Sequence, residues 1–251
     1  MNNLKVDSVE VEKTDIKINL DKLFAGTNNY FGIYDWQKFF PAYRSSKEHP
    51  APDFNVLGKV LKLPLPLTDG NLIRDDYFLI YLPKSLNGSP TTFGSFISLF
   101  PAAGHNGFLK FSAEFYPDHE DHQDRFNNLA SWTFSGWALV VTKALPGLAN
   151  KSWNKQIEVL HKTKHYPLKI IEAVMAIQLL LTKKHQKISF AGRTSASIDL
   201  SGIDEVKRYH LLINIEDQEI IVSNIQNKTK DNKLLLFSGY KLNKPKPSPH
   251  S

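Results

Sequence analysis

Apolar and polar residues alternate in both terminal parts of the chain. Residues 4–20 (LKVDSVEVEKTDIKINL) place an apolar residue at nearly every second position, and several of these are β-branched. Residues 207–215 (KRYHLLINI), 219–226 (EIIVSNIQ) and 233–242 (KLLLFSGYKL) are similarly rich in apolar residues. This pattern is typical of half-buried β-strands. We therefore expect two short strands near the N-terminus and a three-stranded meander near the C-terminus.

Further strands are expected in the first half of the chain. Residues 77–83 (YFLIYLP) form a short apolar run, and residues 107–115 (GFLKFSAEF) alternate again. Residues 54–67 (FNVLGKVLKLPLPL) also predict a strand, which Pro64 and Pro66 would keep at a sheet edge because proline has no N–H for the sheet ladder. Large aromatic side chains prefer burial, so we expect these in the core: Tyr30, Phe31, Tyr34, Trp36, Phe39 and Phe40.

The middle of the chain has a helical period instead. Apolar residues recur there at spacings of three and four: Phe126, Leu129, Ala130, Phe134 and Trp137. Residues 151–164 (KSWNKQIEVLHKTK) predict another helix with Ser152 as its N-cap, and residues 169–181 (KIIEAVMAIQLLL) predict a longer buried helix close behind Pro167. Residues 132–147 (WTFSGWALVVTKALPG) fit either a continuation of the first helix or a buried strand.

Together these patterns predict an α+β fold: largely antiparallel sheets, strand-rich N- and C-terminal parts and a central helical section. Residues 1–243 are expected to form one domain, and a division into two subdomains near residue 150 is the alternative. The proline- and lysine-rich end, residues 244–251 (KPKPSPHS), has nothing apolar to bury and is predicted to be a disordered tail.

The composition narrows the chemistry and the compartment. None of the 251 residues is cysteine, which excludes disulfides, thiolate metal ligands and cysteine nucleophiles. The first residues, MNNLKVDSVEVEK, lack the basic-then-apolar order of a secretory signal, and no uninterrupted apolar run reaches the ~20 residues of a membrane span. We therefore expect a cytoplasmic protein without a transmembrane segment. Walker A, G-x-G-x-x-G and G-x-S-x-G sequences are absent, so no cofactor is predicted.

Positive charge gathers in the second part of the chain. Residues 1–150 carry 14 Lys and Arg against 16 Asp and Glu, a net of −2, whereas residues 151–251 carry 17 against 9, a net of +8. This asymmetry favours an anionic partner. Our leading hypothesis is a non-enzymatic binding module, an adaptor or accessory subunit of a larger assembly, that docks through this basic half onto a protein with an acidic surface. The lysines predicted to make the contact are Lys151, Lys155, Lys162, Lys164, Lys183, Lys184 and Lys187.

Nonspecific nucleic-acid binding is an alternative use of the same lysines. Residues 151–187 contain no arginine. Because base readout relies mostly on Arg, Asn and Gln, this segment supports at most a general contact with phosphates. A solvated helix face without a partner explains the same lysines, and the sequence leaves these interpretations open.

Acids and histidines crowd into residues 118–124 (DHEDHQD). Carboxylates and imidazoles are suitable ligands for zinc, iron or manganese, so a metal-dependent hydrolase is the rival hypothesis. Its ligands would be Asp118, His119, Asp121 and His122, with His105 as a further ligand. The competing interpretation is a capped helix start, in which the acids accept hydrogen bonds from the first-turn amides and complement the positive end of the helix dipole.

Metal analysis separates these two interpretations. The capping interpretation assigns a structural role to the acids, so we expect the purified protein to carry no stoichiometric transition metal. It also predicts that replacing His119 and His122 by alanine leaves the protein folded. The measurement is elemental analysis by mass spectrometry of the wild type and the double variant. A stoichiometric metal that is lost in the variant would support the hydrolase instead.

Overall fold

The structure is a computed structural model of the full chain. It describes residues 4–40, 51–65, 72–86, 88–97, 99, 110–114, 136–142, 145–148, 151–168, 170–184, 194–197, 210–216, 219–225, 235–236, 238–240 and 242. The helices of this part are α1 (Leu4–Leu23), α2 (Ile33–Phe39), α3 (Phe54–Val60), α4 (Ile73–Asp76), α5 (Phe93–Ile97), the 3-10 turn Pro146–Leu148, α7 (Trp153–Lys162) and α8 (Ile170–Lys184).

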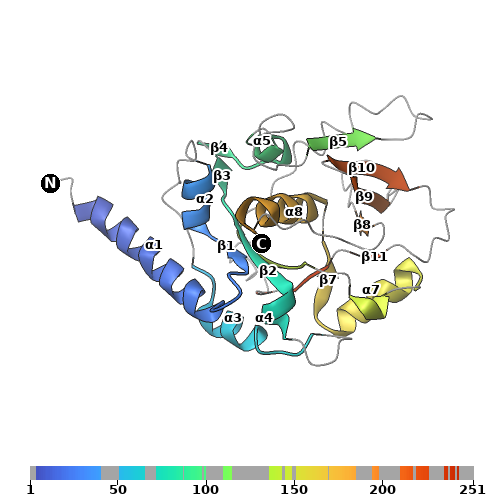
Figure 1. Ribbon diagram of the computed structural model, residues 1–251, viewed down its shortest axis with the longest axis horizontal. Coiled ribbons are helices and arrows are strands. Elements are labelled where there is room, and N and C mark those ends of the chain that lie inside the picture. The colour runs from blue at the N-terminus through green and yellow to red at the C-terminus, as the bar shows by residue number, and fades with distance from the viewer. Residues whose placement is uncertain are drawn as a thin grey trace, which may run out of the picture.

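The described strands form two five-stranded sheets and one short hairpin. They are β1 (Tyr30–Phe31), β2 (Tyr77–Leu82), β3 (Ser85–Leu86), β4 (Ser89–Pro90), β5 (Lys110–Glu114), β6 (Gly136–Val141), β7 (His165–Pro167), β8 (Thr194–Ser197), β9 (His210–Glu216), β10 (Glu219–Ile225), β11 (Leu235–Leu236) and β12 (Ser238–Tyr240). With helices and antiparallel-rich sheets, the predicted α+β class is confirmed (Figure 1).

The first sheet has the strand order β1-β2-β6-β12-β7. Its centre is the antiparallel pair β2 and β6, which runs from Tyr77 opposite Val141 to Leu82 opposite Gly136. The short β12 is antiparallel to both β6 and β7, and β1 adds a parallel edge to β2. Strands from residues 30 to 240 therefore share one sheet. The division near residue 150 stays a prediction, and residues 244–251 lie outside the described residues.

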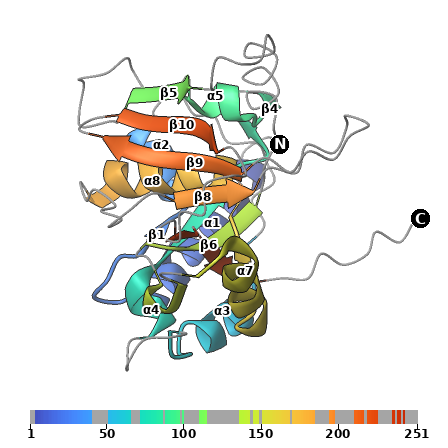
Figure 2. The same ribbon diagram turned by 90° about the vertical axis from the view of Figure 1, so that its right-hand side faces the viewer.

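The second sheet has the order β11-β8-β9-β10-β5. Its centre is the antiparallel hairpin of β9 and β10, in which Glu216 faces Glu219 across the turn. β8 is antiparallel to β9, while β5 and β11 are parallel to their neighbours. Figure 2 shows β5, β10, β9 and β8 side by side.

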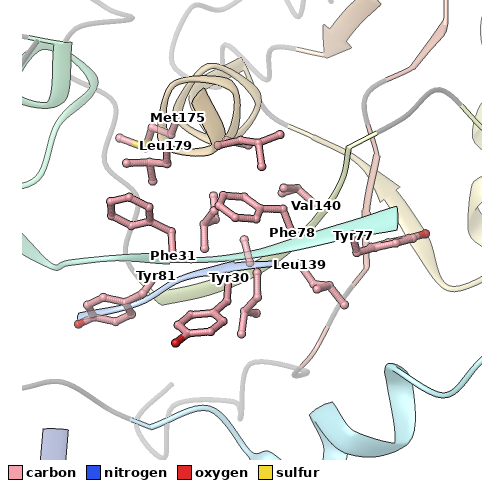
Figure 3. Packing of buried hydrophobic residues seen from close by; sticks show 14 of the residues in the cluster. Tyr30, Phe31, Tyr77, Phe78, Tyr81, Leu139, Val140, Met175 and Leu179 are labelled. Atoms are coloured by element: carbon pink, nitrogen blue, oxygen red, sulfur yellow. The ribbon is translucent and has the colours of Figure 1, made fainter. Parts of the chain in front are cut away.

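Helix α8 lies between the two sheets. It contacts β1, β2 and β6 of the first sheet and β8 of the second. All its residues from Glu172 to Thr182 are buried, as the nearly continuous apolar sequence predicts for a helix covered on every side. In Figure 3, Phe31, Phe78 and Val140 lie on the α8 side of the first sheet, near Met175 and Leu179.

The prediction of strands over residues 4–20 is wrong, because this segment is part of α1. Ile16, Leu20 and Phe24 are buried at a spacing of four, whereas Ile18, which the alternation would place with them, is 45 % exposed. The apolar residues of this segment fit both the two-residue period of a strand and the 3.6-residue period of a helix. The segment also contains no Gly or Pro to interrupt a helix. Packing against the remainder of the fold selects the helical period.

The expected edge strand over residues 54–67 is also wrong where the structure describes it. Asp53 caps α3 by accepting a hydrogen bond from Val56 N at 3.0 Å. Leu57, Val60 and Leu61 then follow at helical spacing and are buried. Only a single β-bridge remains at Pro64, opposite Leu72.

The C-terminal meander is wrong in its third strand. The first two strands exist as β9 and β10, but the segment after them divides between the sheets. β11 joins β8 of the second sheet in parallel, and β12 enters the first sheet between β6 and β7. Local pattern predicts a strand, but not its partner in a sheet.

Other predicted elements are confirmed. Strands β2 and β5 and helix α7 lie within the expected segments, and α8 continues past the expected end at residue 181 to Lys184. Within residues 132–147, which the sequence leaves open, residues 136–141 form β6. Of the six aromatic residues expected in the core, Tyr30, Phe31, Trp36 and Phe40 are buried, while Tyr34 and Phe39 are half-buried. None of the described helices is long and apolar enough to cross a membrane.

Candidate functional site

The predicted docking lysines of α7 face solvent. Lys155, Lys162 and Lys164 are exposed, and Lys151, just before the helix, is half-buried. Glu158 lies between two of them and pairs with Lys155 and with Lys162, in each case at 2.7 Å. These two lysines lower the pKa of Glu158 to about 2. The outer side of α7 is therefore cationic but carries one built-in counter-charge.

The sequence of α7 explains this orientation. Leu160 and Gln156, four positions apart, are buried, so the opposite side of the helix faces solvent. Gln156 also donates a side-chain hydrogen bond to the carbonyl oxygen of Lys151 at 2.9 Å, which fixes the start of the helix. Ser152 has the extended backbone of an N-cap, as predicted, although its side chain makes no capping hydrogen bond.

Lys183 and Lys184, at the end of α8, point inward instead. Lys183 Nζ lies 3.0 Å from the Asp35 carboxylate and donates to the carbonyl oxygen of Tyr30 at 2.5 Å. Lys184 donates to the side-chain oxygen of Asn29. The structure therefore separates the predicted lysines into an outer group on α7 and an inner pair on α8. Lys187 lies outside the described residues.

The ion pair of Lys183 and Asp35 is largely buried. Its side chains are 7 % and 13 % exposed. Burial lowers the pKa of Lys183, and the nearby carboxylates of Asp35 and Asp21 oppose that shift by stabilising the ammonium form. Asp35 also accepts the backbone N–H of Gly32 at 2.8 Å, so the same carboxylate closes the start of α2.

A second ion pair continues this charge network to α1. Asp21 accepts hydrogen bonds from Lys17 Nζ, at 2.5 Å, and from the hydroxyl of Tyr30. Burial raises the pKa of Asp21, but the hydrogen bonds from Lys17 and Tyr30 outweigh it and hold that pKa below its usual range. Lys183 Nζ lies 3.7 Å from the centre of the Tyr30 ring, so Tyr30 connects both ion pairs.

These groups line a pocket of about 660 Å³. Its wall is formed by the end of α1, the turn after it, β1, α2 and the end of α8. The lining residues are Lys17, Asp21, Phe24, Ala25, Gly26, Asn28, Tyr30, Tyr34, Asp35, Lys38, Phe39 and Lys183. Gly26, with φ of 82°, makes the turn that leads from α1 to β1, a conformation that L side chains rarely adopt.

A buried histidine lies in the first sheet, away from this pocket. His165 is 3 % exposed; its Nδ1 donates to the carbonyl oxygen of Thr163 at 2.7 Å, and its Nε2 accepts from the hydroxyl of Tyr77. Burial lowers the pKa of His165 to about 4, although the Thr163 carbonyl acts in the opposite direction. The imidazole is therefore neutral at pH 7, and its hydrogen bond with Tyr77 links β7 to β2 across the intervening strands.

The candidate metal ligands Asp118, His119, Asp121, His122 and His105 lie outside the described residues. Among the residues that are described, no group of His, Asp and Glu side chains could hold a metal ion. The hydrolase hypothesis therefore stays a prediction.

Sequence reasoning missed the acids of the pocket. Asp35 stands three residues after Gly32, the spacing at which an acid bonds back to the start of its helix, and Lys17 and Asp21 are four residues apart. Both spacings are visible in the sequence. Their convergence on Lys183, about 150 residues later, is a tertiary contact that spacing does not reveal.

Comparison with protein-family models, with curated proteins and with solved structures finds no match for this chain. The functional argument therefore rests on the chemistry of its own residues.

Replacing Lys183 by methionine is expected to lower the free energy of unfolding by about 3–5 kcal/mol, because Asp35 would remain buried and unpaired. Replacing Lys17, whose pair with Asp21 is 46 % exposed on each side, should cost less than about 1 kcal/mol. Urea unfolding of both variants measures this difference. Equal losses would contradict the importance assigned to the buried pair.

Acid should destabilise the protein through His165. The folded state holds its pKa near 4, below the ordinary value of about 6.5, so as pH falls the unfolded chain takes up a proton first. This lowers the free energy of unfolding by about 3 kcal/mol between pH 7 and pH 4. Unfolding of wild type and His165→Gln across this range isolates the contribution. An NMR titration in which His165 protonates near pH 6.5 would contradict it.

Proposed function

We propose that the protein is a non-enzymatic binding module, an adaptor or accessory subunit of a larger assembly, and that it docks onto an acidic protein surface through its basic C-terminal half. The contact surface is the outer side of α7, which we call the α7 face, made of Lys151, Lys155, Lys162 and Lys164 with Glu158 among them. One observation carries the proposal: Lys155 and Lys162 project to solvent from a helix whose other side is fixed in the core, and the exposed Lys164 follows directly after it.

The α7 face has the charge that such a contact requires. Four lysines and one glutamate give it a net charge of +3. Exposed ion pairs contribute only about 0–1 kcal/mol each, so Lys155 and Lys162 lose little by exchanging Glu158 for a partner's carboxylate. Distributed charge of one sign also speeds association and selects against basic partners. The α7 face therefore acts by steering and selection, with a protein supplying the complementary acids.

An acidic protein fits this face better than a nucleic acid does. Lysine is a point charge on a flexible stem, and the forked geometry of arginine, which recognises phosphates and bases in pairs of hydrogen bonds, is missing from residues 151–187. Lys183 and Lys184, which a longer basic stripe would need, are turned into the fold. Among the described lysines of residues 151–187, the exposed ones, Lys155, Lys162 and Lys164, lie in α7 or directly after it.

Charge changes on α7 should move affinity in both directions. Lys155→Glu and Lys162→Glu are each expected to weaken partner binding by about three- to tenfold, whereas Glu158→Gln should strengthen it by about two- to threefold by removing the internal competitor. The partner is first recovered with the tagged protein from its native cells and identified by mass spectrometry. Its dissociation constant is then measured by calorimetry at low and high salt.

Lys59→Glu, the same charge reversal on the exposed side of α3, is the matched control and should leave affinity unchanged. Loss of binding in all three reversal variants alike would overturn the assignment to α7. Weaker binding by Glu158→Gln would do the same. Tighter and more salt-dependent binding to a single-stranded DNA oligonucleotide than to the recovered protein would favour the nucleic-acid function.

A further inference from the structure

We propose that the pocket between α1, α2 and the end of α8 is a binding site for a small organic monocarboxylate with an apolar body. This site is distinct from the α7 face and does not depend on the docking function. It combines a volume of about 660 Å³, within the roughly 300–1,000 Å³ of ligand sites, with a lining shared by charged and aromatic side chains.

The charge balance of the pocket favours one negative charge on the ligand. Three ammonium groups and two carboxylates line it. The carboxylates are already engaged: Asp21 with Lys17, and Asp35 with Lys183. Lys38 is left without a carboxylate partner among the described residues, and its Nζ lies 5.1 Å from the centre of the Phe39 ring. The pocket thus has a net charge of +1, which a single carboxylate neutralises.

The lysines of the pocket also keep N–H groups that no described acceptor of the pocket occupies. Each ammonium has three N–H groups. Lys183 uses two of them, on Asp35 and on the carbonyl oxygen of Tyr30, and Lys17 uses one, on Asp21. Both oxygens of Asp21 are taken, one by Lys17 and one by the Tyr30 hydroxyl. A ligand that brings acceptor oxygens is therefore better satisfied here than one that brings donors.

Aromatic side chains supply the apolar wall. Phe24 and Tyr30 are buried with their ring centres 5.8 Å apart, and Phe39 is partly buried in the same pocket. Phe24 and Tyr30 are almost fully buried, and Lys183 lies against the Tyr30 ring. The half-buried Phe39 therefore offers the apolar contact for the body of the ligand. The ammonium of Lys38 beside Phe39 meets the carboxylate at the exposed end. A free phosphate has no apolar part to contact Phe39, and an amine would meet the net positive charge.

A ligand panel with matched charge variants tests this site on the full chain. The probes are hexanoate, benzoate, 3-phenylpropionate and indole-3-acetate, together with 3-phenylpropanol and 3-phenylpropylamine as the neutral and cationic counterparts of one of them. Ligands of this size typically bind with dissociation constants on the order of 1 mM. Binding is followed by NMR titration of the backbone amides of Gly26 and Gly32, which adjoin the pocket.

We expect at least one carboxylate to saturate these shifts, and the alcohol and amine to bind at least about fivefold more weakly than 3-phenylpropionate. Lys38→Met should weaken carboxylate binding by about three- to tenfold, while Lys59→Met, the same change on α3, should leave it unchanged. Lys38 is exposed, so its replacement does not threaten the fold. The proposal is overturned if no carboxylate binds, if the alcohol or amine binds as tightly, or if Lys38→Met binds like wild type.

Discussion

Placing the ammonium group of Lys183 in the interior requires a carboxylate beside it, because an unpaired buried charge costs several kcal/mol. Asp35 of α2 provides that carboxylate, and the carbonyl oxygen of Tyr30 in β1 provides a second acceptor. The ring of Tyr30 lies against the same ammonium, and its hydroxyl reaches Asp21 of α1. One cation therefore joins the end of α8 to the edge strand and to both N-terminal helices. Because Lys183 lies in the last turn of α8, its charge also complements the negative end of that helix dipole.

The position of α8 explains why so much depends on its end. A helix that is apolar on all sides must be covered on all sides, and α8 is enclosed by the first sheet and by β8 of the second. The buried part of α8 ends at its two C-terminal lysines. Lys183 hydrogen-bonds to the Tyr30 carbonyl oxygen in β1, and Lys184 hydrogen-bonds to the side chain of Asn29. Asn29 itself donates to the carbonyl oxygens of Arg74 and Asp75. The pocket lies where α1, α2 and the end of α8 meet.

The sequence correctly predicts the elements whose hydrophobic pattern is compatible with only one environment. The apolar run of β2, the amphipathic pattern of α7 and the mostly apolar pattern of α8 each fit one environment, and each is confirmed. It fails for α1, where Ile16, Ile18 and Leu20 fit a strand as well as a helix, and only packing distinguishes them. It fails for β12 because strand pattern does not say which sheet a strand enters. The same limit applies to the pocket: the sequence shows Lys183 as one cation of a basic segment, but its partner Asp35 comes from a helix far away in the sequence.

Lysines of one basic segment thus have two different roles. Those of α7 face solvent, where their charge is available to a partner, and those at the end of α8 hold the fold together. The most direct test of this account is a double-mutant cycle on Lys183→Met and Asp35→Asn, with free energies of unfolding measured in urea. We predict a coupling energy of about 2 kcal/mol between the two positions. Losses that add to within about 0.5 kcal/mol would show that the pair does not join these elements.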